Sequence, residues 1–461
     1  MTAAAADPGS FRDPGSRVFV DGQRVLRAIY KRSANDYAAA RDKGVLDYFI
    51  SKGWLVESQE VDVASHAAGV GADHLLEHPK LPFVSYPYEW PFALHRKAAL
   101  LQLDVMLEAL ERDFTLSDAT AYNIQFLGSE PKFIDHLSLR PYVDGELWSG
   151  HRQFCMQFLN PIIMWSRLGL APNSWFRGSL EGIAPEDLSR LLRWRDNLSL
   201  TILSHVTAQG AAQRRATETD GANVAKTGKL SKTSFKAMLL GLRDFIAKAS
   251  VPTEKTVWDT YDKVNSYQTD EADKKRRFVM RMVEGCKPKL LYDLGCNTGD
   301  YSAAALEAGA EYVIGFDFDH GALERAVKRS SDGNLPYLPL WLDATNPSPA
   351  QGWNQQERRG FSDRARGDAV IALAFIHHLA IARNIPLESV IDWIMAVAPV
   401  GIIEFPPKSD PMVQRLLSRR EDIFPNYTGD RFIAEIQKRG RIVEREQLSP
   451  GGRLMVWYDR S

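Results

Sequence analysis

The chain has 461 residues, more than one ordinary hydrophobic core accommodates, so two or three domains are expected. Hydrophobic residues make up 44% and aromatic residues 10% of it, which is the composition of a folded protein rather than a disordered one. The formal net charge of −1 means that the chain has no overall positive charge to attract nucleic acid or an anionic membrane. Cys155, Cys286 and Cys296 are too few and too scattered for a disulfide framework or a zinc-binding spacing, so no metal site is expected.

The first sixteen residues are rich in Ala, Pro and Gly and include Asp7, Arg12 and Asp13 without a continuous apolar stretch. They do not read as a secretory signal, and no later run is long enough to cross a bilayer. We therefore expect a cytoplasmic protein without membrane insertion, whose residues 1–16 form a disordered tail.

One change in composition divides the chain. The stretch from Thr207 to Lys232 has no aromatic residue and almost no large aliphatic one, so it cannot bury enough apolar surface to order itself. Ser234 to Ala249 has the apolar spacing of a helix and is expected at the junction. The expected division is a tail at 1–16, an accessory domain at 17–206, a linker at 207–233 and a second domain at 234–461.

The second domain alternates strand and helix patterns. Strands are expected at Lys289–Asp293, Tyr312–Asp317, Tyr337–Asp343, Asp368–Ala374 and Gly401–Phe405, and helices at Ser302–Ala310, His320–Arg329, Pro386–Ala398 and Gly429–Arg439. This alternation predicts right-handed βαβ units and a doubly wound α/β fold with a parallel sheet. Arg441–Leu448 and Arg453–Tyr458 flank a turn and predict a closing antiparallel hairpin, which makes the sheet mixed.

A glycine-containing turn stands between the first of these strands and its helix, where residues 293–300 read DLGCNTGD. Gly295 and Gly299 permit a tight turn, and Asn297 tolerates a positive φ. Backbone N–H groups at the start of a helix point at a bound ligand. Asp293 would repel a pyrophosphate, but it suits a cationic sulfonium ligand that carries an amino-acid tail.

Two further carboxylates end the next two strands. Asp317 stands where an acid accepts from ribose hydroxyls, and Asp343 stands where it can accept from an adenine amino group. The pattern resembles the class I S-adenosylmethionine-dependent methyltransferases, although Asn297 stands where that family more often has Gly. The resemblance implies a Rossmann-like sheet, S-adenosyl-L-methionine as cofactor, and contacts with it from Asp293, Gly295, Cys296, Asn297, Thr298, Gly299, Asp317, Phe318, Asp343 and Ala344.

Two other interpretations of the turn remain open. An NAD-type fingerprint requires G-x-G-x-x-G, and Asn297 and Asp300 occupy its second and third glycine positions. The turn is otherwise a simple connection between strand and helix without a ligand. Both are less favoured than S-adenosylmethionine.

Candidate catalytic residues follow the fourth and fifth strands. His377 or His378 could take a proton from an attacking hydroxyl, because an imidazole titrates near neutral pH. His378 is preferred by resemblance, while the alternative is that one His packs or caps the next segment. Glu404 either contacts the acceptor or belongs to a structural turn.

The first domain contains Asp118 and Asn123 at the D-x-x-x-x-N spacing of a kinase catalytic loop, and Asp135 follows after a hairpin-like interval. In kinases the first Asp orients the acceptor hydroxyl and the other two residues hold Mg²⁺. Val18–Ile29 predicts a β-hairpin and Ala98–Leu110 a helix. The region resembles an α+β kinase or aminoglycoside phosphotransferase fold.

The departures from the kinase pattern are substantial. Leu116 stands where the loop has His, Asp135 is followed by His136 rather than Phe, and Arg27 stands where a Lys is expected. No Gly-rich phosphate loop is evident. We therefore expect Asp118, Asn123 and Asp135 to be a vestigial kinase site in a domain that selects the acceptor.

The sequence leads to three functional hypotheses. The first is transfer of a methyl group from S-adenosyl-L-methionine to a small-molecule or glycan acceptor by O-methylation. The second is a bifunctional kinase–methyltransferase, and the third is a non-enzymatic S-adenosylmethionine-binding adaptor. Nucleic acid is disfavoured as a partner because the chain lacks a basic patch with interleaved aromatic residues.

Overall fold

The structure is a computed structural model that describes residues 5–211, 213, 229–252, 267–418 and 420–461. The chain divides into two compact units. The first comprises Met1–Phe126, Glu130–Thr253 and Gln351–Arg358, and the second comprises Leu127–Ser129, Glu254–Ala350 and Arg359–Ser461. Within the described ranges, no helix is both long enough and apolar enough to cross a membrane.

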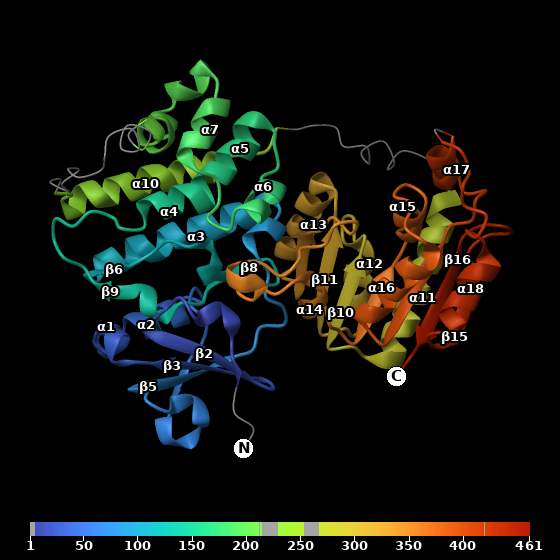
Figure 1. The fold of residues 1–461 in the computed structure, drawn as a ribbon, viewed down its shortest axis with the longest axis horizontal. Helices are drawn as coiled ribbons and strands as arrows, with labels where there is room; N and C mark the ends of the chain where they lie inside the picture. Colours follow the sequence, from blue (N-terminus) through green and yellow to red (C-terminus); the bar gives the residue numbers. More distant parts are fainter. Residues whose placement is uncertain (1–4, 212, 214–228, 253–266, 419) are drawn as a thin grey trace. The chain divides into compact units, whose positions relative to one another are not determined.

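In the described part of the second unit, seven strands form one sheet (Figure 1). They are β10 (Leu290–Leu294), β11 (Tyr312–Asp317), β12 (Tyr337–Trp341), β13 (Ala369–Ala372), β14 (Val400–Phe405), β15 (Arg441–Gln447) and β16 (Leu454–Asp459). Their spatial order is β12-β11-β10-β13-β14-β16-β15; β10 to β14 are parallel, and β16 is antiparallel to both its neighbours. The predicted mixed sheet with a closing hairpin is confirmed.

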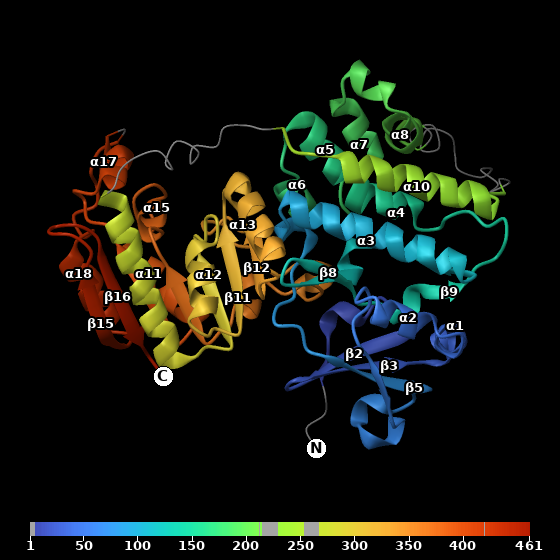
Figure 2. The ribbon, with the colours of Figure 1, turned by 180° about the vertical axis from the view of Figure 1, so that it is seen from behind.

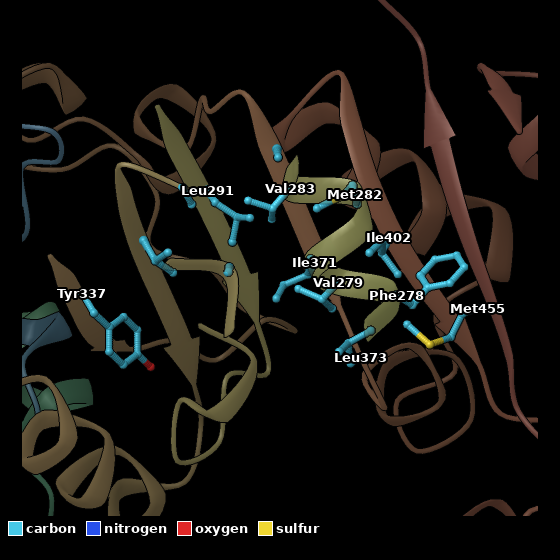
Figure 3. Packing of buried hydrophobic residues seen from close by; sticks show 14 of the residues in the cluster. Phe278, Val279, Met282, Val283, Leu291, Tyr337, Ile371, Leu373, Ile402 and Met455 are labelled. Atoms are coloured by element: carbon cyan, nitrogen blue, oxygen red, sulfur yellow. The ribbon is translucent and has the colours of Figure 1, made fainter. Parts of the chain in front are cut away.

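Helices cover both faces of this sheet, as the views from opposite sides in Figures 1 and 2 show. One face carries α11 (Tyr267–Cys286), α12 (Asp300–Glu307) and α13 (His320–Asp332), whose apolar residues share a core with the strands. Figure 3 shows Phe278 and Met282 of α11 close to Ile371 and Ile402 of the sheet. The remaining helices of this unit are α14 (Phe361–Arg364), α15 (Ile376–Ala380), α16 (Leu387–Val397), α17 (Pro411–Leu417) and α18 (Gly429–Gln437).

Coverage on both faces explains why the parallel strands are mostly apolar and buried, with acidic residues confined to the last two positions of β10, β11 and β14. Every residue of β12 and β13 is buried, as is all of β11 except the half-buried Asp317 at its end. Because the strands are parallel, their carboxyl ends meet at one edge of the sheet. Polar residues at these ends therefore come together, and this edge carries the candidate site.

The first unit opens with an antiparallel sheet. Its strands are β1 (Ala5–Ala6), β2 (Ser16–Asp21), β3 (Arg24–Ile29), β4 (Gln59–Val61) and β5 (His74–Pro79), in the order β1-β2-β3-β5-β4. The hairpin of β2 and β3 turns at Gly22, which has a φ of +59°. The predicted hairpin over Val18–Ile29 is confirmed. Two helices, α1 (Lys31–Asp42) and α2 (Val45–Ser51), lie between β3 and β4 in sequence.

The rest of the first unit is mainly helical. Its long helix α3 (Phe92–Glu111) buries residues around most of its circumference, which is typical of a central helix. Short strands pair as β6 (Phe114–Leu116) with β9 (Leu139–Pro141), and as β7 (Ile124–Leu127) with β8 (Glu130–Phe133). The other helices are α4 (His151–Phe154), α5 (Asn160–Leu168), α6 (Asn173–Gly178), α7 (Pro185–Leu191), α8 (Leu200–Ile202) and α10 (Lys232–Lys248).

Some expected boundaries differ from the structure. The described part of the expected tail, from Ala5, is ordered: β1 pairs with β2, and Asp7 caps a 3-10 turn by accepting from the Gly9 N–H. Helix α10 belongs to the first unit, where its Arg243 pairs with Asp104 of α3 at 2.5 Å. Backbone pairing and helix packing of this kind involve partners that local composition does not reveal.

Candidate functional site

The turn after β10 adopts the backbone conformation that its residues predict. Gly295, Asn297 and Gly299 all have a positive φ, of +83°, +48° and +80°. The Gly295 N–H donates to the Phe316 carbonyl oxygen at 2.8 Å, which ties the turn to β11. A Cβ atom at Gly299 would lie 2.7 Å from a ring carbon of Tyr337, so only glycine fits there. The turn is therefore a fixed element of the sheet edge.

Asp293 lies at the base of this turn and is 2% exposed. Ser302, in the first turn of α12, donates its hydroxyl to Oδ2 of Asp293 at 2.6 Å. Burial raises the pKa of Asp293 to about 7, despite the Ser302 hydrogen bond and with a further contribution from Asp317. No other described residue donates to this carboxyl group. Asp293 is thus able to ionise when a cationic group reaches it.

Asp317 is held by two backbone N–H groups. Asn297 donates to its Oδ2 and Asp319 to its Oδ1, each at 2.8 Å. Burial raises the pKa of Asp317, although these two hydrogen bonds oppose the change. Each carboxylate oxygen has more than one lone pair, so both still have capacity for a ligand's hydroxyl groups.

Asp343 follows β12 and is half-buried. The backbone N–H and the hydroxyl of Thr345 both bond to its Oδ1, at 3.0 and 2.6 Å. In the part of the chain that the structure describes, nothing bonds to its Oδ2. That oxygen is available as a single acceptor for an amino group.

Phe318, which the resemblance already places at the cofactor, belongs to an aromatic group with Trp341 and His320, two residues that sequence reasoning missed. The Trp341 indole N–H donates to the Phe318 carbonyl oxygen at 3.1 Å, and the Phe318 ring is 6.0 Å from the Trp341 ring. Phe318 is 60% exposed, and the His320 ring stacks on Trp341 at 5.8 Å. The signal in the sequence was an aromatic residue at the end of each of two adjacent strands. An exposed aromatic ring just after the end of β11 suits a flat heterocycle such as adenine.

The other residues expected at the cofactor have different surroundings. The Cys296 side chain lies in the core with Leu323 and Trp341, and burial raises the pKa of its thiol well above the ordinary value. Thr298 donates its hydroxyl to Asp300, and Arg329 donates to the Thr298 carbonyl oxygen at 2.9 Å. Ala344 is half-buried beside Asp343. The side chains of Cys296 and Thr298 therefore contact other parts of the protein, and these two residues contribute backbone atoms to the turn.

Both candidate histidines are on α15, after the end of β13. His377 is buried, and burial lowers its pKa to about 2; neither ring nitrogen has a hydrogen-bond partner among the described residues. His378 is half-buried, and burial lowers its pKa as well. Their ring centroids are 4.1 Å apart. Both imidazoles are neutral near pH 7, and His378 is the more accessible.

Glu404 lies in a buried ion-pair network. Its Oε1 is 2.8 Å from Nζ of Lys275 and 3.2 Å from a guanidinium nitrogen of Arg453, while its Oε2 accepts the Ala374 N–H at 2.7 Å. Burial opposes its charge, but Lys275 and Arg453 hold the pKa of Glu404 below the ordinary value. Ala374 has a φ of +49°, so Glu404 fixes a strained backbone position just before α15. This geometry favours a structural role for Glu404.

In the first unit the structure brings Asp118, Asn123 and Asp135 together. The Asn123 amide donates to Asp118 at 3.2 Å and to Asp135 at 3.3 Å. The hydroxyl oxygen of Ser138, which sequence reasoning missed, lies within hydrogen-bond distance of both carboxylates, at 2.8 Å from Asp118 Oδ1 and 2.5 Å from Asp135 Oδ2. Burial and the charge of Asp135 raise the pKa of Asp118 to about 6. Arg27 donates to Asp135 at 2.8 Å and thereby occupies a carboxylate that a metal would need.

The whole chain has a curated relative. The nodulation protein NoeA of Rhizobium meliloti (strain 1021) is 43% identical to it over 469 residues, which cover 100% of this chain and 98% of NoeA. The chain belongs to the NoeA family. No family model matches this member of the NoeA family.

Solved structures resemble a part of this NoeA family chain. Magnesium protoporphyrin IX methyltransferase (ChlM) from Synechocystis PCC 6803, with bound SAH, is 18% identical, with a TM-score of 0.32 over 43% of this chain and 89% of ChlM. The N-methyltransferase NodS from Bradyrhizobium japonicum WM9 is 12% identical, with a TM-score of 0.31 over 41% of this chain and 96% of NodS. These scores are too low to decide function, so the site itself must carry the functional argument.

Proposed function

We propose that the second unit binds S-adenosyl-L-methionine and transfers its methyl group to a small-molecule or glycan acceptor by O-methylation. The observation that carries the proposal is the placement of Asp293, Asp317 and Asp343 at the carboxyl ends of the adjacent strands β10, β11 and β12. A nucleotide with a pyrophosphate would meet three acidic side chains there, which do not complement its negative charge. A nucleoside with a cationic sulfonium and an ammonium group would meet three complementary acceptors.

The residues of the edge fit this ligand one by one. Asp293 would accept from the ammonium group, Asp317 from the ribose hydroxyls and Asp343 from the adenine amino group, with the Phe318 ring against the base. Gly295 keeps the turn free of side chains. S-adenosyl-L-methionine, when bound, supplies an activated methyl group. The protein contributes orientation and a fixed electrostatic environment.

The acceptor side of the proposal depends on α15. A neutral His378 can accept the proton of the attacking hydroxyl, and a base within hydrogen-bond reach accelerates such a step by about 10²–10⁴-fold. His377 is more deeply buried and is the weaker candidate. Glu404 would support the segment through the Ala374 N–H without touching the acceptor.

NoeA is a nodulation protein, and we propose that this chain also serves in nodulation. In this proposal the first unit selects the acceptor. Transfer is tested by incubating the purified full chain with isotopically labelled S-adenosyl-L-methionine and extracts of the native host. We expect label in a small molecule or glycan, together with S-adenosylhomocysteine, from the native chain and from a control Asp332→Ala variant, and much less label from Asp317→Ala at cofactor concentrations below the native dissociation constant. Equal labelling by Asp317→Ala would show that the carboxylates at this edge of the sheet have no role in the reaction.

A second candidate function adds phosphoryl transfer by the first unit. The convergence of Asp118, Asn123 and Asp135 favours it, and the Arg27–Asp135 ion pair opposes it. Acceptor modification that depends on ATP would support this bifunctional alternative. The third alternative, a non-enzymatic adaptor, predicts ligand binding without any S-adenosylhomocysteine formation.

A further inference from the structure

Outside both sites described above, three side chains with metal-binding atoms converge in the helical part of the first unit. They are His151, Cys155 and His205, and their ligand atoms all lie within 4.8 Å of one another. His151 Nε2 is 2.8 Å from His205 Nδ1 and 3.6 Å from Cys155 Sγ. Spacings of 4 and 50 residues match no familiar zinc signature, so the sequence alone did not show the cluster.

Local helix geometry makes this convergence possible. His151 and Cys155 are four residues apart at the junction of α4 and a π-helical turn (Cys155–Leu159), so their side chains lie on one helix face. His205 lies in a second π-helical turn (Leu203–Ala208). π-helical turns are rare and occur frequently at functional sites. Here two of them carry the same cluster.

A hydrogen bond between the two imidazoles accounts for only part of the arrangement. His151 Nε2 contacts both His205 Nδ1 and Cys155 Sγ, but one ring nitrogen has at most one proton to donate. A metal ion would accept a lone pair from all three atoms at once. The charges are also compatible, because the neighbouring Arg152 is paired with Glu186 at 2.9 Å.

The distances fit a small tetrahedral ion. Zn–N bonds of about 2.0–2.1 Å and a Zn–S bond of about 2.3 Å set N–N pairs about 3.3 Å and N–S pairs about 3.6 Å apart. The His151–Cys155 distance of 3.6 Å already matches an N–S pair, and the two imidazoles need to separate by about 0.5 Å, which a small side-chain rotation provides. Two imidazoles and one thiolate are ligands that Zn²⁺ prefers.

We propose that His151, Cys155 and His205 bind one Zn²⁺ ion in the first unit. The residues leave a fourth coordination position. His151 and His205 are half-buried rather than fully enclosed, so water or an oxygen ligand can reach it. Three protein ligands with an open position characterise zinc sites that bind or polarise a ligand, whereas purely structural sites have four protein ligands. This inference is independent of the methyltransferase proposal.

Cobalt substitution of the full-length protein tests the site. After removal of bound metal with a chelator, one equivalent of Co²⁺ should give a thiolate-to-cobalt charge-transfer band, and Zn²⁺ should displace it. Cys155→Ser should abolish the band, and His205→Gln should weaken Zn²⁺ affinity by more than about 10-fold, since loss of even an outer partner of a metal ligand costs 10–100-fold. His74→Ala and Cys286→Ser serve as matched controls and should behave as the native protein.

Each outcome of the cobalt experiment either supports or overturns the proposed zinc site. No charge-transfer band in the native protein overturns it, whatever the variants do. A band that persists in Cys155→Ser places the cobalt at another cysteine and also overturns it. If Cys155→Ser fails to fold, as judged by circular dichroism, the native band together with the affinity of His205→Gln still decides. S-adenosylhomocysteine binding, measured on the same samples, reports separately on the second unit.

Discussion

The proposed cofactor site depends on individual carboxylates whose environments differ. Asp317 receives two backbone hydrogen bonds in a fixed orientation, so a ligand hydroxyl meets an acceptor that needs no rearrangement. Asp293 is buried with one partner, so its charge is costly until a cation arrives. These differences lead to separate predictions for the two residues.

Replacing Asp317 by Ala should weaken S-adenosylhomocysteine binding by about 1–3 kcal/mol, the range for hydrogen bonds to a charged acceptor. The native affinity is expected at the micromolar level, about −8 kcal/mol. Isothermal titration calorimetry measures both. Asp332→Ala, which removes an exposed carboxylate that pairs with Lys328 on α13, is the matched control and should leave affinity unchanged. Unchanged affinity in Asp317→Ala would exclude this residue from the site.

The raised pKa of Asp293 predicts a pH-dependent affinity. The folded, ligand-free protein favours protonated Asp293, so this group contributes stability below the ordinary pKa near 4, and that contribution is lost as the pH rises through about 7. A ligand ammonium group favours the ionised form, so binding releases a proton below pH 7. S-adenosylhomocysteine should therefore bind about tenfold more tightly at pH 8 than at pH 6.

Calorimetry in buffers of different ionisation enthalpy checks this proton release. Asp293→Asn should bind more weakly and lose most of the pH dependence. Asp317, whose pKa is raised in the same direction, would account for a smaller remaining slope. If Asp293→Asn keeps the full pH dependence of S-adenosylhomocysteine affinity, another group releases the proton.

Sequence reasoning located Asp293, Asp317 and Asp343 because each ends an apolar strand, and such strands are visible as local patterns. It missed Ser302, Tyr337 and Lys275, which contact residues that lie well away from them in the sequence. Ser302 is nine residues from Asp293, and Lys275 is far from Glu404 in the chain. Contacts of this kind depend on packing, which a local pattern does not encode.

At the scale of elements, the strands of the second unit were predictable. β11 was predicted at both ends, and the other parallel strands to within about two residues, because each is a continuous apolar run between turn residues. The apolar spacing of α10 could also be recognised in the sequence, but the domain that packs against this helix could not. Phe235, Leu239, Leu242 and Ile246 form a buried face, and an amphipathic pattern does not say which domain buries it.

The placement of α10 in the first unit predicts which domain a core substitution affects. Leu239→Ala should destabilise the first unit by about 2–5 kcal/mol, because Leu239 is fully buried and the substitution leaves a cavity. Scanning calorimetry of the full chain should show a lower transition for this unit and an unchanged transition for the second. S-adenosylhomocysteine identifies the second unit's transition by raising it.

Leu240→Ala provides the control, because Leu240 is the adjacent residue of the same helix and is 52% exposed. It should leave both transitions in place. If Leu239→Ala instead lowers the transition that S-adenosylhomocysteine raises, α10 belongs with the second unit, and the boundary lies before Lys232.

At the scale of the whole molecule, each unit has its own cluster of acidic residues, and we expect the two clusters to differ in whether they bind a ligand. In the proposed function the carboxylates of the second unit contact a ligand, whereas Arg27 pairs with Asp135 in the first unit. Phosphoryl transfer requires carboxylate and amide ligands for Mg²⁺ together with a cradle for the phosphates. The sequence shows no Gly-rich loop to supply that cradle.

We therefore expect Mg-ATP to leave the thermal transition of the first unit unchanged. A ligand present at about one hundred times its dissociation constant would add about 2.7 kcal/mol, which calorimetry detects readily. S-adenosylhomocysteine in the same samples is the positive control for the second unit. Asp118→Ala should keep methyl transfer within about tenfold of the native rate. A clear Mg-ATP shift that Asp135→Ala abolishes would promote the bifunctional alternative.

The network around Glu404 also constrains how the family can diverge. Lys275 on α11 and the strained Ala374 bond to this one carboxylate, and so does Arg453 just before β16, which also pairs with Asp410 at 2.7 Å. Removing a single partner of a buried ion pair costs about 3–5 kcal/mol, so stepwise loss would pass through unstable intermediates. Members of the NoeA family should therefore keep Glu404 and Lys275 together. Lineages that lose the acid should have replaced Lys275 as well, whereas Arg453 keeps Asp410 as a partner.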